Sequence, residues 1–183
     1  MVEINVSQQL KEPIGSTRNY EVSDTVDIDG TDNIVQGLIS LTRTDRGILT
    51  KGTLHTQSKL TCSRCLSEFD YPLTLNIEEE YFPSIDIMSG TPLPSPEEPG
   101  TFTINENNVL DLAEAIRQYA VMAIPMKPLC QKDCAGLCPT CGVNLNKASC
   151  NCPTSPTDSR WAKLSKLVLA NAEAPAEEQK GTK

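Results

Sequence analysis

The chain has 183 residues, 16 basic and 24 acidic side chains, a net charge of −8 and eight cysteines. A chain of this length can bury a hydrophobic core, so stability does not require a disulfide framework. It opens on no secretory signal pattern and contains no apolar stretch long enough to span a bilayer, which predicts a cytoplasmic protein.

The first part of the chain is predicted to be mostly β-structure. After a single helical turn at residues 7–10, apolar and polar residues alternate over residues 35–41 and again over residues 48–60. Turn-forming residues 44–47 separate these runs, which indicates a β-hairpin. Residues 69–77 alternate in the same way, so an antiparallel sheet with one buried face is expected.

Two helices and one irregular loop are predicted after the sheet. Residues 89–101 are rich in Pro, Ser, Gly and Glu and have no periodicity, which is typical of a mobile loop. A helix that covers the sheet is expected from Asn108, as its cap, to a stop at Pro125. A second amphipathic helix is expected over residues 158–171.

The fold class that follows is α+β. We expect an antiparallel sheet that could close into a barrel-like form, with a covering helix, in residues 1–125. A cysteine-rich zinc module with a C-terminal helix is expected in residues 126–170, and a disordered tail in residues 171–183.

Charge is divided unevenly between these regions. Residues 1–125 carry 8 basic and 19 acidic side chains, whereas residues 126–170 carry 6 basic and 2 acidic ones. The basic region coincides with most of the cysteines. It permits a contact with RNA or the ribosome there, although a solvated charged face explains the same count.

The cysteines are better explained as metal ligands than as disulfide partners, because thiol systems of a reducing compartment keep cysteines reduced. Cys138 and Cys141 form the clearest pair. In Cys138-Pro139-Thr140-Cys141-Gly142 a tight turn can aim two thiolates at one metal, and Gly142 tolerates the positive φ that such a turn requires.

Eight thiolates suit two tetrahedral sites, but their division is open. The preferred division joins Cys138 and Cys141 with Cys150 and Cys152, and leaves Cys62 and Cys65 to meet Cys130 and Cys134 across the fold. The single residue between Cys150 and Cys152 strains joint ligation. One of them could therefore be a spectator, with Cys134 as the alternative ligand of the first site.

Catalysis finds little support in the sequence. Cys62 and Cys65 have the spacing of a redox-active pair, but the segment after them is a predicted strand rather than a helix that would lower a thiol pKa. His55 is the only histidine, and no serine lies in an elbow motif. Four-thiolate zinc sites are generally closed and structural, so we expect a protein that is not an enzyme.

With these features in place, the chain resembles the YceD-like family of bacterial and organellar proteins linked to accumulation of large-subunit ribosomal RNA. The resemblance rests on Ile4–Ser7, Leu10–Glu12, Cys62–Leu66, Leu110–Leu112, Pro125–Cys130, Gly136–Gly142, Asn144–Asn146 and Arg160–Ala162.

The resemblance implies a non-enzymatic role in the synthesis, processing or stability of 23S RNA during ribosome assembly. The partner is then the large-subunit RNA or a ribosomal protein, and neither a membrane nor a small-molecule substrate is expected. An adaptor that grips a basic ribosomal protein with its acidic sheet domain is the alternative, and iron could replace zinc. The basic residues expected to contact RNA phosphates are Lys127, Lys132, Lys147, Arg160, Lys163 and Lys166.

Overall fold

The computed structural model describes residues 2–28, 30–94 and 100–152. It divides into two compact units, Met1–Cys134 and a second that begins at Ala135. The division places Cys130 and Cys134 in the unit that contains the sheet. The predicted second helix at residues 158–171 and the tail at residues 171–183 lie outside the described residues.

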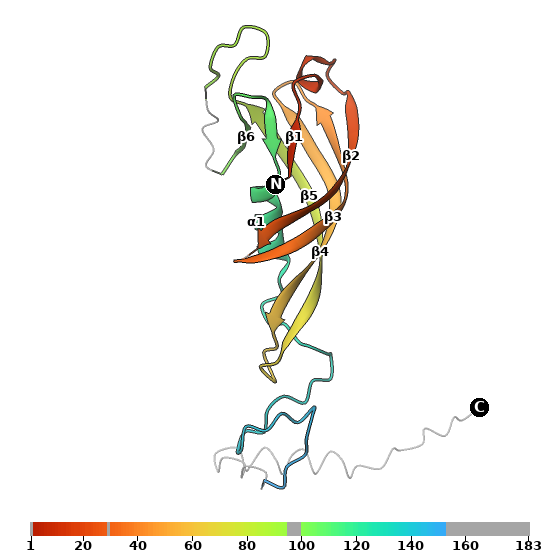
Figure 1. The fold of residues 1–183 in the computed structure, drawn as a ribbon, viewed down its shortest axis with the longest axis vertical. Helices are drawn as coiled ribbons and strands as arrows, with labels where there is room; N and C mark the ends of the chain where they lie inside the picture. Colours follow the sequence, from red (N-terminus) through yellow and green to blue (C-terminus); the bar gives the residue numbers. More distant parts are fainter. Residues whose placement is uncertain (1, 29, 95–99, 153–183) are drawn as a thin grey trace, which may run out of the picture. The chain divides into compact units, whose positions relative to one another are not determined.

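The first unit is built on a five-stranded sheet in the order β2-β3-β4-β5-β6 (Figure 1). Strands β2 to β5 pair antiparallel with their neighbours, whereas β6 pairs parallel to β5. Two short strands, β1 and β7, pair with each other as a separate ribbon. Their bounds are β1 Glu3–Asn5, β2 Thr17–Ile28, β3 Thr31–Arg43, β4 Ile48–Thr61, β5 Glu68–Pro83, β6 Phe102–Ile104 and β7 Val109–Asp111.

The expected hairpin is confirmed by β3 and β4. Its turn is closed by the Thr44 N–H, which donates to the Gly47 carbonyl at 3.0 Å. The strand expected at residues 69–77 is the first part of β5, which continues to Pro83. The prediction that the sheet could close into a barrel is wrong, because the edge strands β2 and β6 do not pair with each other. The sheet is also mixed rather than purely antiparallel, because β6 pairs parallel to β5.

The structure corrects the start of the covering helix. Helix α1 spans Ala113–Ala123, and Leu112 rather than Asn108 is its N-cap residue. Asn108 instead has φ +57° in the turn between β6 and β7, where its N–H donates to the Asn105 carbonyl. The turn expected at residues 7–10 is a 3-10 helix at Gln9–Lys11.

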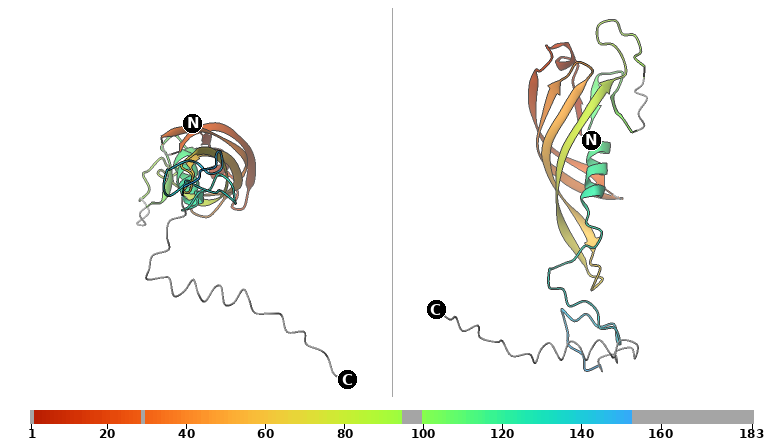
Figure 2. Two further views of the ribbon diagram at one scale, coloured as in Figure 1. Left: turned by 90° about the horizontal axis from the view of Figure 1, so that it is seen from below. Right: turned by 180° about the vertical axis from the view of Figure 1, so that it is seen from behind.

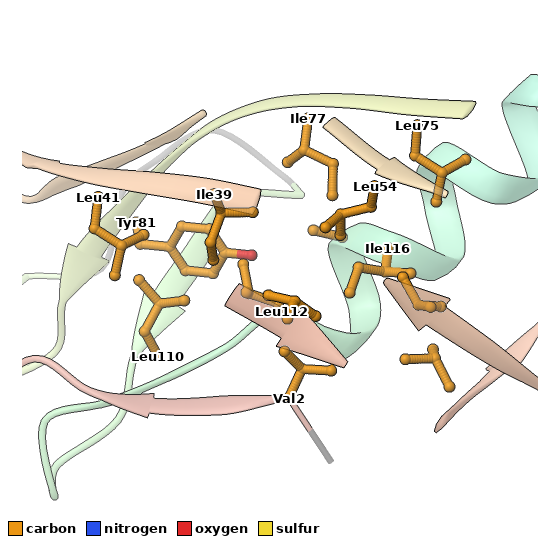
Figure 3. Close-up of a cluster of buried hydrophobic side chains, with 14 of the residues drawn as sticks. Val2, Ile39, Leu41, Leu54, Leu75, Ile77, Tyr81, Leu110, Leu112 and Ile116 are labelled. Atoms are coloured by element: carbon orange, nitrogen blue, oxygen red, sulfur yellow. The ribbon is translucent and has the colours of Figure 1, made fainter. Parts of the chain in front are cut away.

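A single hydrophobic core joins the sheet, the β1–β7 ribbon and α1. Ala115, Ile116 and Ala120 of α1 are buried against it. Figure 3 shows Ile116 and Leu112 beside Leu54 and Ile39 of the sheet. The views in Figure 2 show the sheet curving around this interior, with α1 against its inner side. Burial of this apolar surface is the main force that holds the unit together.

Two glycines on the inner face let β3 and β4 approach closely where the sheet curves. A Cβ added to Gly52 would lie 2.4 Å from the Leu38 carbonyl oxygen and 2.7 Å from the Ile39 Cα. A Cβ added to Gly37 would lie 2.2 Å from the Thr53 carbonyl oxygen. Any larger residue at either position would push the two strands apart.

Strands β4 and β5 stay paired well beyond the point at which β4 stops pairing with β3. The β3–β4 register ends at Gln36 opposite His55, whereas β4 and β5 stay paired as far as Thr61 opposite Glu68 (Figure 1). This two-stranded projection, residues 56–73, is called the β4–β5 arm below. Its tip carries Cys62 and Cys65.

The connection after β5 is irregular where it is described. The Asp86 N–H donates to the Thr91 carbonyl, and Ile85 forms an isolated bridge with Pro92. The mobility expected for residues 89–101 stays a prediction, and residues 95–99 lie outside the described part of the chain. Among the residues that the structure describes, no helix is long and apolar enough to cross a membrane.

The glycine contacts generate a stability prediction. Replacement Gly52→Ala is expected to lower the free energy of unfolding by about 2 kcal/mol, because the new methyl group meets the β3 backbone. Gly30→Ala is the control: Gly30 has φ +79° but nothing within 4 Å of its Cβ position, so only about 1 kcal/mol of backbone strain is expected. Urea unfolding measures both, and a smaller effect at Gly52 than at Gly30 would contradict the packing.

Candidate metal centres

The tip of the β4–β5 arm and the segment after α1 bring four cysteines together. The Ser63 N–H donates to the Pro128 carbonyl at 2.8 Å and ties the two segments to each other. The sulfurs of Cys62 and Cys134 lie 3.7 Å apart, and those of Cys65 and Cys130 lie 3.6 Å apart. All four sulfurs lie within 4.8 Å of one another. These residues are called the first tetrad.

The other four cysteines form a second tetrad, within the second unit. Cys138, Cys141, Cys150 and Cys152 also place their sulfurs within 4.8 Å of one another. A small loop framework holds them: the Leu145 N–H donates to the Gly136 carbonyl, and Leu137 bridges Asn144. Both Cys150 and Cys152 take part, so the single residue between them does not keep either sulfur away.

The two tetrads are the grouping that the sequence favoured. Their geometry fits a tetrahedral metal, because four thiolates around zinc, at about 2.3 Å each, leave sulfurs about 3.8 Å apart. The 3.6 and 3.7 Å separations in the first tetrad are close to that value and far above a disulfide bond length of about 2.05 Å. Both tetrads could hold metal ions.

Each tetrad contains the same backbone turn. In the first, the Cys62 N–H donates to the Ser67 carbonyl and the Leu66 N–H donates to the Cys62 carbonyl. In the second, the Cys138 N–H donates to the Val143 carbonyl and the Gly142 N–H donates to the Cys138 carbonyl. This repeated turn aims both cysteines of a C-x-x-C pair at one point.

The residue after each pair adopts a left-handed backbone. Gly142 has φ +72°, as its sequence position predicted, whereas Leu66 has φ +54°. Leucine there costs about 1 kcal/mol more than glycine, and its side chain is 64% exposed. The exposure shows that Leu66 does not recover this cost by core packing.

The environment of the sulfurs favours a bound cation. The Cys65 backbone N–H, the largest contribution, lowers the pKa of Cys62 to about 6, and the Cys141 N–H does the same for Cys138. Burial and the neighbouring Cys65 thiol raise the pKa of Cys130 to about 12. Hydrogen bonding with the Cys141 thiol raises the pKa of Cys152 to about 12. Four neighbouring thiols cannot all ionise unless positive charge lies among them.

Arg64 has a positional role that the sequence did not reveal. Its Nη1 donates to the Cys134 carbonyl at 3.0 Å, which adds a second tie between the arm and the segment after α1. The sequence signal for this role is the position of Arg64 between Cys62 and Cys65, which places its backbone close to Cys130 and Cys134 once the four cysteines share one site.

The residues expected to contact RNA are only partly described. Lys127 and Lys132 are exposed in the first unit and Lys147 is exposed in the second. Arg160, Lys163 and Lys166 lie outside the described residues. His55 is exposed on β4, where its Nδ1 lies 3.3 Å from the Thr74 hydroxyl oxygen.

Comparison with known families tests the resemblance directly. The family model described as large ribosomal RNA subunit accumulation protein YceD matches residues 50–168. The chain belongs to this family. The range of the YceD match contains both tetrads.

Relatives of the chain include two uncharacterised mycobacterial proteins and one plant protein that carries the name of this family. An uncharacterised protein of Mycobacterium tuberculosis is 30% identical over 123 residues, which cover 67% of this chain and 56% of that protein. One from Mycobacterium leprae is 24% identical over 131 residues, 71% of this chain and 57% of the relative. A chloroplastic YCED homolog of Arabidopsis thaliana, named as a large ribosomal RNA subunit accumulation protein, is 33% identical over 58 residues, 32% of this chain and 18% of its own length.

The chain thus spans a little over half the length of the mycobacterial relatives. No solved structure matches it.

Because the two tetrads share no cysteine, we expect independent metal sites. Protein purified without chelators is expected to hold two metal ions per chain, and Cys62→Ser and Cys138→Ser are each expected to remove one of them. Elemental analysis with titration of accessible thiols measures this, and each variant is the control for the other. A wild-type protein with one ion, retained in Cys62→Ser, would exclude the first tetrad as a metal site.

Proposed function

We propose that the chain is a non-enzymatic factor that supports the synthesis, processing or stability of large-subunit (23S) ribosomal RNA in the cytoplasm, with one structural zinc ion in each tetrad. The observation that carries the proposal is the match to the YceD family over a range that contains both tetrads. A relative in this family is named for accumulation of the large ribosomal RNA subunit.

Zinc is the metal that suits these residues best. Four thiolates in a tetrahedral arrangement are typical of structural zinc, which performs no redox chemistry of its own. Within the described residues, each tetrad supplies four sulfurs, so a zinc ion would have no open position for water or substrate. Such a site stabilises a fold, which agrees with a binding function rather than catalysis.

Zinc in the first tetrad would fix the arm to the segment after α1. Lys127 and Lys132 lie on that segment, between α1 and Cys134. Without the metal, the hydrogen bonds from Arg64 to Cys134 and from Ser63 to Pro128 would still connect the arm to this segment. The proposed role of zinc is therefore to present this basic segment in one conformation to RNA phosphates.

The function is tested by complementation in a bacterium that lacks its own YceD-family gene. This chain is expected to restore the ratio of 23S to 16S RNA, measured on total RNA, whereas Cys62→Ser with Cys138→Ser is expected to fail. Gly30→Ala is the matched control, since Gly30 lies between β2 and β3, in a segment that contains no cysteine. An unchanged 23S ratio on expression of the folded wild-type chain would contradict the proposal.

Direct phosphate contact predicts a change in salt dependence. Replacing Lys127, Lys132 and Lys147 by Gln is expected to lower the slope of log K against log salt by about 2 for single-stranded RNA, because each phosphate contact releases counterions. The matched control replaces Lys11, Lys51 and Lys59, which lie in the acidic part of the chain. An equal slope in both triple variants would remove these lysines from the RNA contact.

A further inference from the structure

A groove opens on the first unit where β3 and β4 separate. It has a volume of about 690 Å³, and residues 31–34 and Gln36 of β3 form one wall. Residues 55–57 and Lys59 of β4 form the other wall, with nearby residues of β5 behind them. Thr56 stands at the point of separation, where its hydroxyl donates to the Ile34 carbonyl at 2.8 Å.

In the β4–β5 ladder, pairs that exchange hydrogen bonds alternate with pairs that do not, and this alternation shows which backbone groups of β4 face the groove. Pro72 lies opposite Gln57 and has no N–H, so this pair cannot be one that exchanges hydrogen bonds. The backbone N–H and C=O of Gln57 therefore point away from β5, toward the groove. Because the ladder alternates, those of Lys59 point the same way, whereas Thr56 and Ser58 bond to β5.

The glycine contacts independently support this assignment of which β4 residues bond to β5 and which bond to β3. Gly52 and Ile39 lie opposite each other, and a Cβ on Gly52 would be 2.7 Å from the Ile39 Cα. Such a close approach is typical of a pair without ladder hydrogen bonds. Odd-numbered residues of β4 therefore bond toward β3. Beyond His55, β4 is not paired with β3, so the backbone groups of Gln57 and Lys59 face an open edge.

The opposite wall is also a strand edge. Residues 31–35 of β3 pair with β2 but not with β4. The Ile34 carbonyl bonds to the Thr56 hydroxyl, so Ile34 faces the groove, and by alternation Asp32 does as well. Two open strand edges that face each other match the backbone of an extended chain, which can add a strand to a sheet.

The charges around the groove indicate the chemistry of its occupant. Asp32 and Asp70 line it, and Asp27 lies opposite Asp32 in the β2–β3 register. Lys59 also lines the groove and lies opposite Asp70 in the β4–β5 register. The surrounding residues 1–125 have a net charge of −11. Such a field repels phosphates and attracts cations.

We propose that this groove binds an extended basic segment of a partner protein by strand addition to residues 57–59 of β4. Cationic side chains of the segment then face Asp32 and Asp70, and alternate apolar side chains lie toward buried Leu73. The inference goes beyond the proposed RNA contact, which uses lysines outside the groove. It places the partner-binding site of an adaptor function on named residues.

The probe is a short synthetic peptide of alternating Lys and Val, added to the full-length chain with its metal. Binding is followed by NMR of backbone amides. The amides of Gln57 and Lys59 are expected to become protected from hydrogen exchange, whereas those of Thr56 and Ser58, already bonded to β5, are expected to change little. The same peptide, N-methylated on alternate residues, keeps its charges but loses backbone hydrogen-bond donors. It is expected to bind at least about tenfold more weakly.

Two pairs of variants separate strand addition from charge attraction. Lys59→Pro removes the groove-facing N–H without breaking the β4–β5 ladder and is expected to abolish the protection, whereas Lys59→Gln is expected to keep it. The double variant Asp32→Lys with Asp70→Lys is expected to weaken binding. Its matched control is Glu21→Lys with Glu106→Lys, which makes the same change of charge on exposed residues away from the groove.

Each remaining outcome overturns the proposal. Equal binding of the N-methylated and the unmodified peptide would mean that charge attraction alone, without strand addition, explains the binding. Protection of Gln57 and Lys59 before any peptide is added would mean that another part of the chain, or a second copy at high concentration, already fills the groove. Preferential protection of these amides by oligouridine would assign the groove to RNA. None of these results depends on whether the chain affects 23S RNA.

Discussion

Mutual repulsion of crowded thiolates is the constraint on which both candidate metal sites, and the segments that they join, depend. Four sulfurs within 4.8 Å of one another, twice in one chain, are costly to ionise unless a cation lies among them. With such an ion, the turn at Cys62 and the turn at Cys138 become fixed points. The first joins a long β-hairpin to the segment after α1, and the second organises a unit that otherwise consists of loops and turns where it is described.

Charge separates two surfaces for which we propose different partners. The sheet region is acidic and ends in an open strand edge, whereas the cysteine-rich region is basic. The proposed contacts follow this division, with a basic protein segment at the groove and RNA phosphates at the lysines. The two proposed sites use different residues, Asp32 and Asp70 for the protein segment and Lys127, Lys132 and Lys147 for RNA.

The sequence predicted those features that depend on short-range pattern. Alternation over residues 35–41 and 48–60 with a turn at residues 44–47 was enough for the β3–β4 hairpin, and the C-x-x-C spacing was enough for the turn at Cys138. The preferred division of the cysteines matches the two tetrads, since a hairpin tip leaves Cys62 and Cys65 without ligands of their own.

Features set by tertiary structure were missed. Strand β2 has Arg18 and Asp24 on the face that otherwise carries apolar residues, which obscures its alternation, although β2 pairs with β3 along its whole length. Asn108 looked like a helix cap because its left-handed turn also favours asparagine. Barrel closure depends on how far the edge strands β2 and β6 lie from each other, and no local pattern reports that distance.

The most direct test of the account is X-ray absorption at the zinc edge on the metal-bound chain, together with the zinc content. Two zinc ions per chain, each surrounded by four sulfurs at about 2.3 Å and no lighter ligands, are the predicted result. Nitrogen or oxygen in the first coordination sphere, or sulfur coordination with only one zinc per chain, would contradict two closed four-thiolate sites and leave one tetrad without the structural role assigned to it.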